Sequence, residues 1–110
     1  MAKMEWKYTG GFDPREFATV LSLEDDYELK DTEKDLFVAF DCSEASKTLL
    51  LGLADGQHMF VTNIGDTNAV TVANLEDDTG TSLAKGETAL VIGSTTADAT
   101  VILVLNASGD

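Results

Sequence analysis

The chain has 110 residues, of which 20 are Asp or Glu and seven are Lys or Arg, so its formal net charge is −13. This length allows one domain with one core, and an apolar share of 44% favours a globular fold over disorder. An acidic surface without a basic stripe repels phosphate backbones, which argues against DNA or RNA binding.

The first 12 residues are rich in aromatic side chains and are predicted to form an extended N-terminal arm. Trp6, the only tryptophan, lies in this arm together with Tyr8 and Phe12. Exposed aromatic side chains at a terminus are typical of interfaces, so these three are the candidate interaction residues. The alternative is that Trp6 covers the core of its own domain.

Residues 13–110 are predicted to form a single β domain. Residues 13–16 have the Asp-Pro-x-Glu pattern of a helix start. Residues 17–23, however, alternate between apolar and other side chains, which favours a strand. The helix remains the alternative. A turn at 24–26, a short strand at 27–30 and a charged loop at 31–35 are predicted next.

Two continuous apolar runs mark further strands. Residues 36–40 predict a central strand that is buried on both faces. Residues 47–53 predict another strand, with Gly52 as a bulge or a point of close backbone approach. Residues 101–105 are apolar at every position, so this last strand must be covered on both sides, within the domain or by a neighbouring subunit.

The C-terminal half contains one unit twice, at a spacing of 30 residues. The pattern Leu-Ala-x-Gly begins at Leu53 and again at Leu83, and each copy continues with an apolar strand, a polar loop and a second apolar strand. The loops are residues 63–68 and 93–98. Each copy predicts a β-hairpin after a glycine turn. We therefore expect an all-β fold, a single compact sandwich or barrel built from hairpins.

Catalytic and metal-binding residues are not expected. His58 is the only histidine and Cys42 the only cysteine, which leaves no disulfide, no Cys/His zinc site and no base beside a reactive thiol. The acidic triplets at 24–26 and 76–78 lack the spacing of a calcium-binding EF-hand loop, although one weakly bound cation remains an alternative. The sequence predicts a protein that is not an enzyme and has no cofactor.

The N-terminus lacks the apolar region of a signal peptide, and no run approaches the roughly 18 apolar residues that a membrane span requires. The single cysteine suits a reducing compartment. We therefore expect a soluble protein that is made in a cytoplasm and does not contact a membrane.

Several segments resemble the small β modules of tailed-phage virion proteins, which include capsid decoration (cement) proteins, head fibres and tail fibres. They are residues 51–57 (LGLADGQ), 60–72 (FVTNIGDTNAVTV), 80–86 (GTSLAKG) and 91–94 (VIGS). The resemblance extends over residues 49–106. It implies a trimeric structural protein and assigns no binding residues.

Charge and length separate the virion roles. A trimer of −13 chains suits the outside of a DNA-filled capsid, and a 110-residue chain without a collagen-like or coiled-coil shaft is typical of a decoration protein. The expected partners are the major capsid protein and further copies in a homotrimer on the capsid exterior. One alternative is a receptor- or glycan-binding fibre module that uses residues 63–68 and 93–98. Another is a small calcium-dependent hydrolase.

Overall fold

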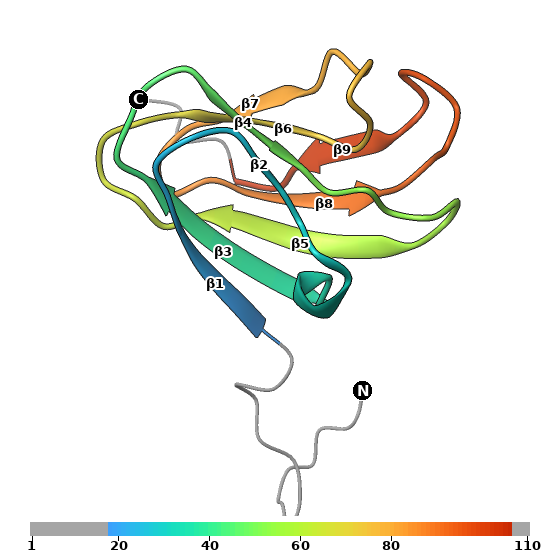
Figure 1. The fold of residues 1–110 in the computed structure, drawn as a ribbon, viewed down its shortest axis with the longest axis horizontal. Helices are drawn as coiled ribbons and strands as arrows, with labels where there is room; N and C mark the ends of the chain where they lie inside the picture. Colours follow the sequence, from blue (N-terminus) through green and yellow to red (C-terminus); the bar gives the residue numbers. More distant parts are fainter. Residues whose placement is uncertain (1–17, 107–110) are drawn as a thin grey trace, which may run out of the picture.

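The computed structural model describes residues 18–106, which form nine strands and one short 3-10 helix. The strands lie in two facing sheets of the orders β1-β3-β5-β8-β9 and β2-β4-β6-β7 (Figure 1). Their bounds are β1 Ala18–Leu23, β2 Tyr27–Glu28, β3 Phe37–Cys42, β4 Lys47–Leu50, β5 His58–Asn63, β6 Val70–Ala73, β7 Thr81–Leu83, β8 Thr88–Ile92 and β9 Val101–Val104, with the 3-10 helix η2 at Asp31–Glu33. The predicted all-β sandwich is confirmed, and in the described residues neither sheet closes into a barrel.

Most of the predicted strands occur where the sequence placed them. β1 confirms the strand alternative for its residues, since its burial alternates along the chain. The predicted arm at residues 1–12 and the helix alternative at residues 13–16 lie outside the described residues. The charged loop at residues 31–35 contains η2, in which the backbone N–H of Glu33 donates to Lys30 O at 2.8 Å.

The first six strands alternate between the two sheets. β1, β3 and β5 pair in parallel in one sheet, and β2, β4 and β6 pair in parallel in the other. Ala18 lies opposite Phe37 and Phe37 opposite Phe60, so each return to the same sheet takes 19 to 23 residues. Parallel neighbours need a crossover connection, and here the crossover contains a strand of the opposite sheet. The chain thus passes three times from the first sheet to the second. We call each of these strand pairs a rung: β1–β2, β3–β4 and β5–β6.

The last three strands close the winding with antiparallel pairs. β7 pairs with β6, β8 with β5, and β9 with β8. The second copy of the repeat is therefore the predicted hairpin, β8–β9. The prediction for the first copy is wrong, because β5 and β6 belong to different sheets.

Asn63 gives the physical reason for this difference. Its side chain is fully buried and donates from Nδ2 to Asn68 O at 2.9 Å and to Leu83 O at 3.0 Å. Its Oδ1 accepts from the backbone N–H of Gly65 at 3.0 Å. These bonds fasten the end of β5 to β7 and direct the chain across the sandwich. The equivalent position of the second copy is Gly93, which has no side chain to do this.

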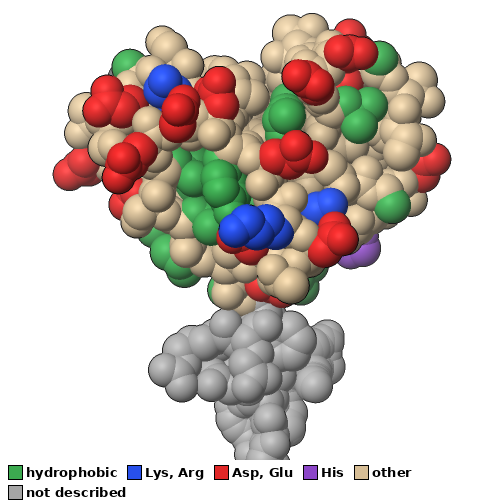
Figure 2. Space-filling view, in the orientation of Figure 1, with side chains coloured by type: hydrophobic (Ala, Val, Ile, Leu, Met, Phe, Trp, Pro, Cys, Tyr) green, Lys and Arg blue, Asp and Glu red, His purple; other side chains and the backbone are tan. Residues whose placement is uncertain are grey.

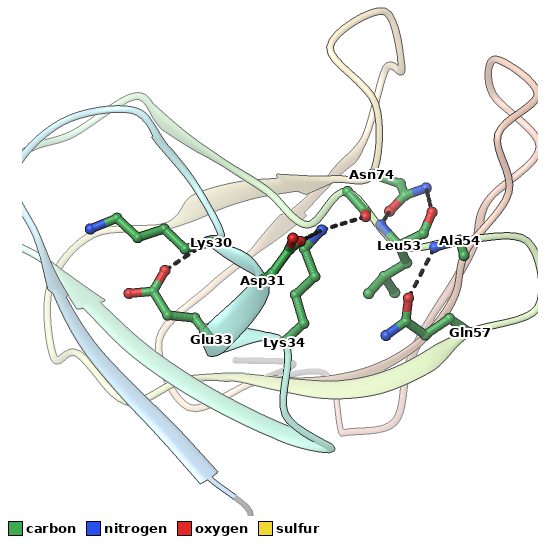
Figure 3. A network of polar contacts seen from close by, with 9 residues as sticks. Lys30, Asp31, Glu33, Lys34, Leu53, Ala54, Gln57 and Asn74 are labelled. Atoms are coloured by element: carbon green, nitrogen blue, oxygen red, sulfur yellow. Dashed lines mark hydrogen bonds and ion pairs between the residues drawn. The ribbon is translucent and has the colours of Figure 1, made fainter.

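The glycine turns of the two copies have the same structure. Gly56 and Gly86 have φ angles of 79° and 80° at the third position of the turn, where a type II turn requires a positive φ. In the first copy the Gln57 N–H donates to Ala54 O at 3.0 Å, and the Gln57 side chain accepts from the Ala54 N–H at 3.0 Å (Figure 3). In the second copy the corresponding bonds are 3.1 and 2.8 Å long.

The repeat also relates β5 to β8 by an approximate two-fold axis. Phe60 pairs with Leu90, which is its own equivalent 30 positions later. The bond from Asn63 N–H to Glu87 O (3.0 Å) has its counterpart in the bond from Gly93 N–H to Gln57 O (2.8 Å). Each turn therefore supports the end of the other copy's strand, and the two turns lie at opposite ends of the β5–β8 pair.

The core lies between the sheets and takes one side of nearly every strand. Phe40, Leu49, Met59, Val72 and Val91 are examples with no more than 1% of their surface exposed. The prediction that residues 36–40 are buried on both faces is wrong, since β3 alternates and Phe37 is 48% exposed. The strand is central, but only one face of its sheet is covered by the described residues.

Gly52 lies two residues after β4, outside any strand, and the group closest to where its side chain would begin is the Lys34 side chain rather than a second backbone segment. Gly52 has a φ of 63°, and its carbonyl oxygen accepts from Lys34 Nζ at 2.8 Å (Figure 3). A Cβ at this position would lie 3.2 Å from the same Nζ atom. Asp31 lies 3.2 Å from the Lys34 ammonium group on its other side, so η2 is joined to the segment after β4.

Candidate interaction surface

The only histidine and the only cysteine lie in adjacent strands but on opposite sides of the sheet. His58 is exposed at the start of β5, whereas Cys42 is buried at the end of β3 with its Sγ atom 3.2 Å from Glu44 O. A nucleophile and its base must lie within hydrogen-bond reach. His58 and Cys42 therefore do not form a catalytic pair.

The acidic triplet at residues 24–26 serves the turn that contains it. Asp25 accepts from the Asp26 N–H at 2.8 Å and from Lys47 Nζ at 3.2 Å, and these contacts, the backbone N–H first, lower the pKa of Asp25. Asp26 accepts from the backbone N–H of Thr48 at 2.9 Å. Between residues 18 and 106, no group of three or more His, Cys, Asp or Glu side chains is placed to hold a metal ion.

Two other carboxylates have the same structural role. The backbone N–H of Lys30 lowers the pKa of Glu33, and Glu33 in turn raises the pKa of Tyr27 by accepting its hydroxyl at 2.8 Å. Asp55 accepts from the backbone N–H and the hydroxyl of Thr95 at 2.6 and 2.9 Å, which lowers the pKa of Asp55. These groups stabilise turns and loops.

The distinctive surface of the domain is the outer side of the five-stranded sheet. One register row crosses all five strands and consists of Ala18, Phe37, Phe60, Leu90 and Leu103. Further apolar side chains flank this row. We call the following set the apolar face: Val20, Phe37, Phe60, Leu90, Ile92, Val101 and Leu103.

Three features indicate that the apolar face is a contact surface. Phe37 and Phe60 stack on it with ring centroids 5.4 Å apart and an interplanar angle of 16°. On the edge strand β9, Val101 and Leu103 are 53% and 54% exposed. Among the outward side chains of these five strands, Asp41 is the one carboxylate. Contiguous exposed apolar surface marks interaction sites.

The outer side of the four-stranded sheet has a different character. Its equivalent register row consists of Thr48, Thr71 and Ser82. A shallow hollow beside this row is lined by the carboxylates of Asp26 and Glu76, among others. Acidic side chains are also spread over the view in Figure 2, where lysines are fewer. Over residues 18–106, the outer side of the five-stranded sheet is thus more apolar than the outer side of the four-stranded sheet, which is polar and acidic.

The predicted interaction residues Trp6, Tyr8 and Phe12 lie outside the described residues. The apolar face was not predicted, although the sequence contained its signal. Residues 36–40 and 101–105 are apolar at both alternating sets of positions, and one set faces outward in each case. β9 is an edge strand, and the described residues leave its outer side exposed, so the described part of the domain does not supply the predicted cover, and cover by a neighbouring subunit stays a prediction.

The two polar loops of the repeat are far from forming one site. Residues 63–68 follow β5 and residues 93–98 follow β8, and these strands are antiparallel neighbours. The loops therefore lie at opposite ends of the strand pair. Asn63 and Asn68 in the first loop also use their side chains for bonds to the backbone of this domain.

Comparison with known proteins identifies no relative: no family model, curated protein or solved structure matches the chain. Over residues 18–106, no helix is long and apolar enough to cross a membrane.

Proposed function

We propose that the protein is a non-enzymatic structural protein of a tailed-phage virion, a capsid decoration protein that binds the outer surface of the head. The observation that carries the proposal is the apolar face on an acidic β sandwich. The resemblance of residues 49–106 to phage virion modules supports the choice of a virion.

The proposed mechanism is association alone. The acidic surface keeps the protein away from packaged DNA, and the apolar face supplies contact area. Rigid pairing of strands in two sheets holds that area in a fixed shape, which favours a repeated, symmetric contact. The partners are the major capsid protein and further copies of the chain, in a homotrimer that bridges capsid subunits.

The test is binding to undecorated capsids of the phage that encodes the chain. We expect co-sedimentation that saturates at a fixed ratio, and density at symmetric positions on the capsid exterior in cryo-electron microscopy. Capsids whose positions are already filled by the untagged protein are the control, and they should bind no labelled copy. Capsids that remain bare at micromolar protein would overturn the proposal.

The alternative is a receptor- or glycan-binding module of a fibre. Because residues 63–68 and 93–98 lie at opposite ends of β5 and β8, one joint glycan site would not form from both loops. A glycan array would favour the alternative if substitutions in one loop abolished a specific signal.

A further inference from the structure

We propose that the apolar face is the docking site for residues 4–12 of a second copy of this chain. The inference deepens the proposed function, because it names what covers this face when the copies associate. It is carried by the face itself, by the chemistry and length of the N-terminal segment, and by the area that a stable interface requires.

The apolar face is too small to hold two copies together by itself. Five strands at a spacing of about 4.8 Å and five residues at about 3.3 Å each give an area of roughly 400 Å². A stable interface buries about 800 Å² on each partner. A face-to-face contact between two copies therefore supplies only about half of the required area, so the face suits a smaller occupant than a second domain.

The N-terminal segment has the composition to cover this face. Met4, Trp6, Tyr8 and Phe12 occupy even-numbered positions, whereas the odd positions between 3 and 9 hold polar or charged residues. In an extended strand alternate side chains point to the same side. An extended segment would thus present its aromatic side to the exposed stack of Phe37 and its neighbours.

Charge also favours the same occupant. Lys3, Lys7 and Arg15 are three of the seven basic residues of the chain, although they lie within its first 17 positions. The remaining 93 positions contain 17 of the 20 carboxylates. The same first 17 positions also hold three carboxylates, Glu5, Asp13 and Glu16, so they are neutral overall, and all of the net charge of −13 belongs to the remaining 93 positions. The segment is therefore not repelled by the acidic domain of another copy, whereas two domains repel each other.

The length of the segment also matches the face. Nine extended residues span about 30 Å, and the face measures about 24 Å across the strands and about 17 Å along them. Asp13 and Pro14 then separate this segment from β1. The residue before a proline favours an extended conformation and proline has a fixed φ, so these two positions restrict how the segment can fold back on its own sheet.

A contact between two different surfaces, in which each copy gives its segment to the next, forms a closed ring if the rotation between neighbouring copies closes. This arrangement agrees with the expected trimer. The two halves of this contact, the segment and the apolar face, lie in different parts of the chain. Each half can therefore be removed by a variant that leaves the other half intact.

The experiment uses two variants that each lack one half of the contact. Deletion of residues 1–12 removes the segment, and Leu103→Lys places a charged side chain on the apolar face, where the aromatic side of the segment would have to cover it. Ser82→Lys is the matched control, since Ser82 is exposed on the outer side of β7, an edge strand of the other sheet. Sedimentation velocity and circular dichroism are recorded for each protein.

We expect the full chain and Ser82→Lys to form the same oligomer. The deletion variant and Leu103→Lys, which we call the two half-variants, should each be a folded monomer when alone. An equimolar mixture of the two half-variants should regain a 1:1 complex, because one contributes the face and the other the segment. In the mixture the emission of Trp6 should move to shorter wavelength, as expected for an indole that leaves water.

Three results would overturn the inference. They are an oligomer that survives the deletion, a mixture that stays monomeric, and a monomeric full chain whose Trp6 emission is independent of concentration. The capsid-binding experiment is separate: a complementing mixture with bare capsids refutes the decoration role alone, and capsid binding by a monomer that fails to complement refutes the inference alone.

Discussion

Asn74 is the residue whose replacement tests most directly what holds the two sheets together. It is 2% exposed, its Oδ1 accepts from the Leu53 N–H at 2.6 Å, and its Nδ2 donates to Leu53 O at 3.2 Å and to Ser94 O at 3.0 Å (Figure 3). It thus joins the end of β6 to the segment before β5 and to the loop after β8. Asn74→Ala removes all three bonds.

The expected loss follows from these contacts. A buried hydrogen bond contributes about 1 kcal/mol net, and a buried group left without a partner costs about 1–3 kcal/mol. Two of the three bonds are to the backbone of Leu53, which is itself 2% exposed, so water cannot replace them easily. Together the three bonds give an expected loss of about 3 kcal/mol in the free energy of unfolding. For a domain of this size that corresponds to a fall in Tm of roughly 12–24 °C.

The assay is urea unfolding followed by circular dichroism, with Asn106→Ala as the matched control. Asn106 is exposed and makes two comparable bonds, at 2.6 Å from the Thr88 N–H and at 3.0 Å to Gly86 O. Because water replaces exposed bonds, its loss should be about 1 kcal/mol or less. Equal losses for Asn74→Ala and Asn106→Ala would refute the reasoning.

Asn74→Asp adds a dependence on pH. The introduced carboxyl group faces two carbonyl oxygens in a buried site, so its pKa in the folded protein is raised above the value of about 3.9 in the unfolded chain. The destabilisation is therefore smallest below pH ~4 and grows as the pH rises toward the folded pKa. A difference from the parent protein that is constant with pH would contradict this.

Two further predictions concern the turns of the repeat. A Cβ on Gly93 would lie 2.5 Å from Leu53 Cβ, so Gly93→Ala should cost about 3 kcal/mol, whereas Gly86→Ala, with open space around it and a φ of 80°, should cost about 1 kcal/mol. Similar urea midpoints for the two variants would argue against this steric account. Thr95 lowers the pKa of Asp55, so this carboxylate stabilises the fold above pH ~4 and its contribution is lost as the pH falls through the lower folded pKa. The difference in urea midpoint between the parent protein and Asp55→Asn should shrink between pH 4 and pH 2 by a measurable amount, and a flat difference would contradict the assignment.

The local parts of the fold were predictable from the sequence. The Leu-Ala-x-Gly pattern predicted the turns at Gly56 and Gly86, and the alternation of side chains predicted β1. Both patterns depend on neighbours within a few residues. The β8–β9 hairpin followed from the same rules. These predictions needed no knowledge of which strands pair.

The pairing of the earlier strands was not predictable in this way. An apolar run after a polar loop indicates a second strand, but it does not distinguish a hairpin partner from a strand of the opposite sheet. In the first copy, the bonds of Asn63 to Asn68 and Leu83 decide between the two. They join positions 5 and 20 residues apart, and no local pattern encodes that choice.

The apolar face was missed for a related reason. Residues 36–40 were interpreted as a strand buried on both faces, and for residues 101–105 cover by the domain and cover by a neighbouring subunit were both left open, since exposed apolar strands are rare. Phe37 and Leu103 show instead that the outer half of such a run can remain available on the domain. Composition alone does not tell whether the cover comes from the same chain.

The three-rung winding leaves β1 and β2 at the open end of each sheet, with no further strand beside them in the described residues. Because each rung adds one strand to both sheets and repeats every 19 to 23 residues, inserted segments of about that length would lengthen the body without altering the antiparallel lid at the other end. Chains of this architecture can thus differ in length by whole rungs, while the end of the sandwich that holds the repeat stays the same.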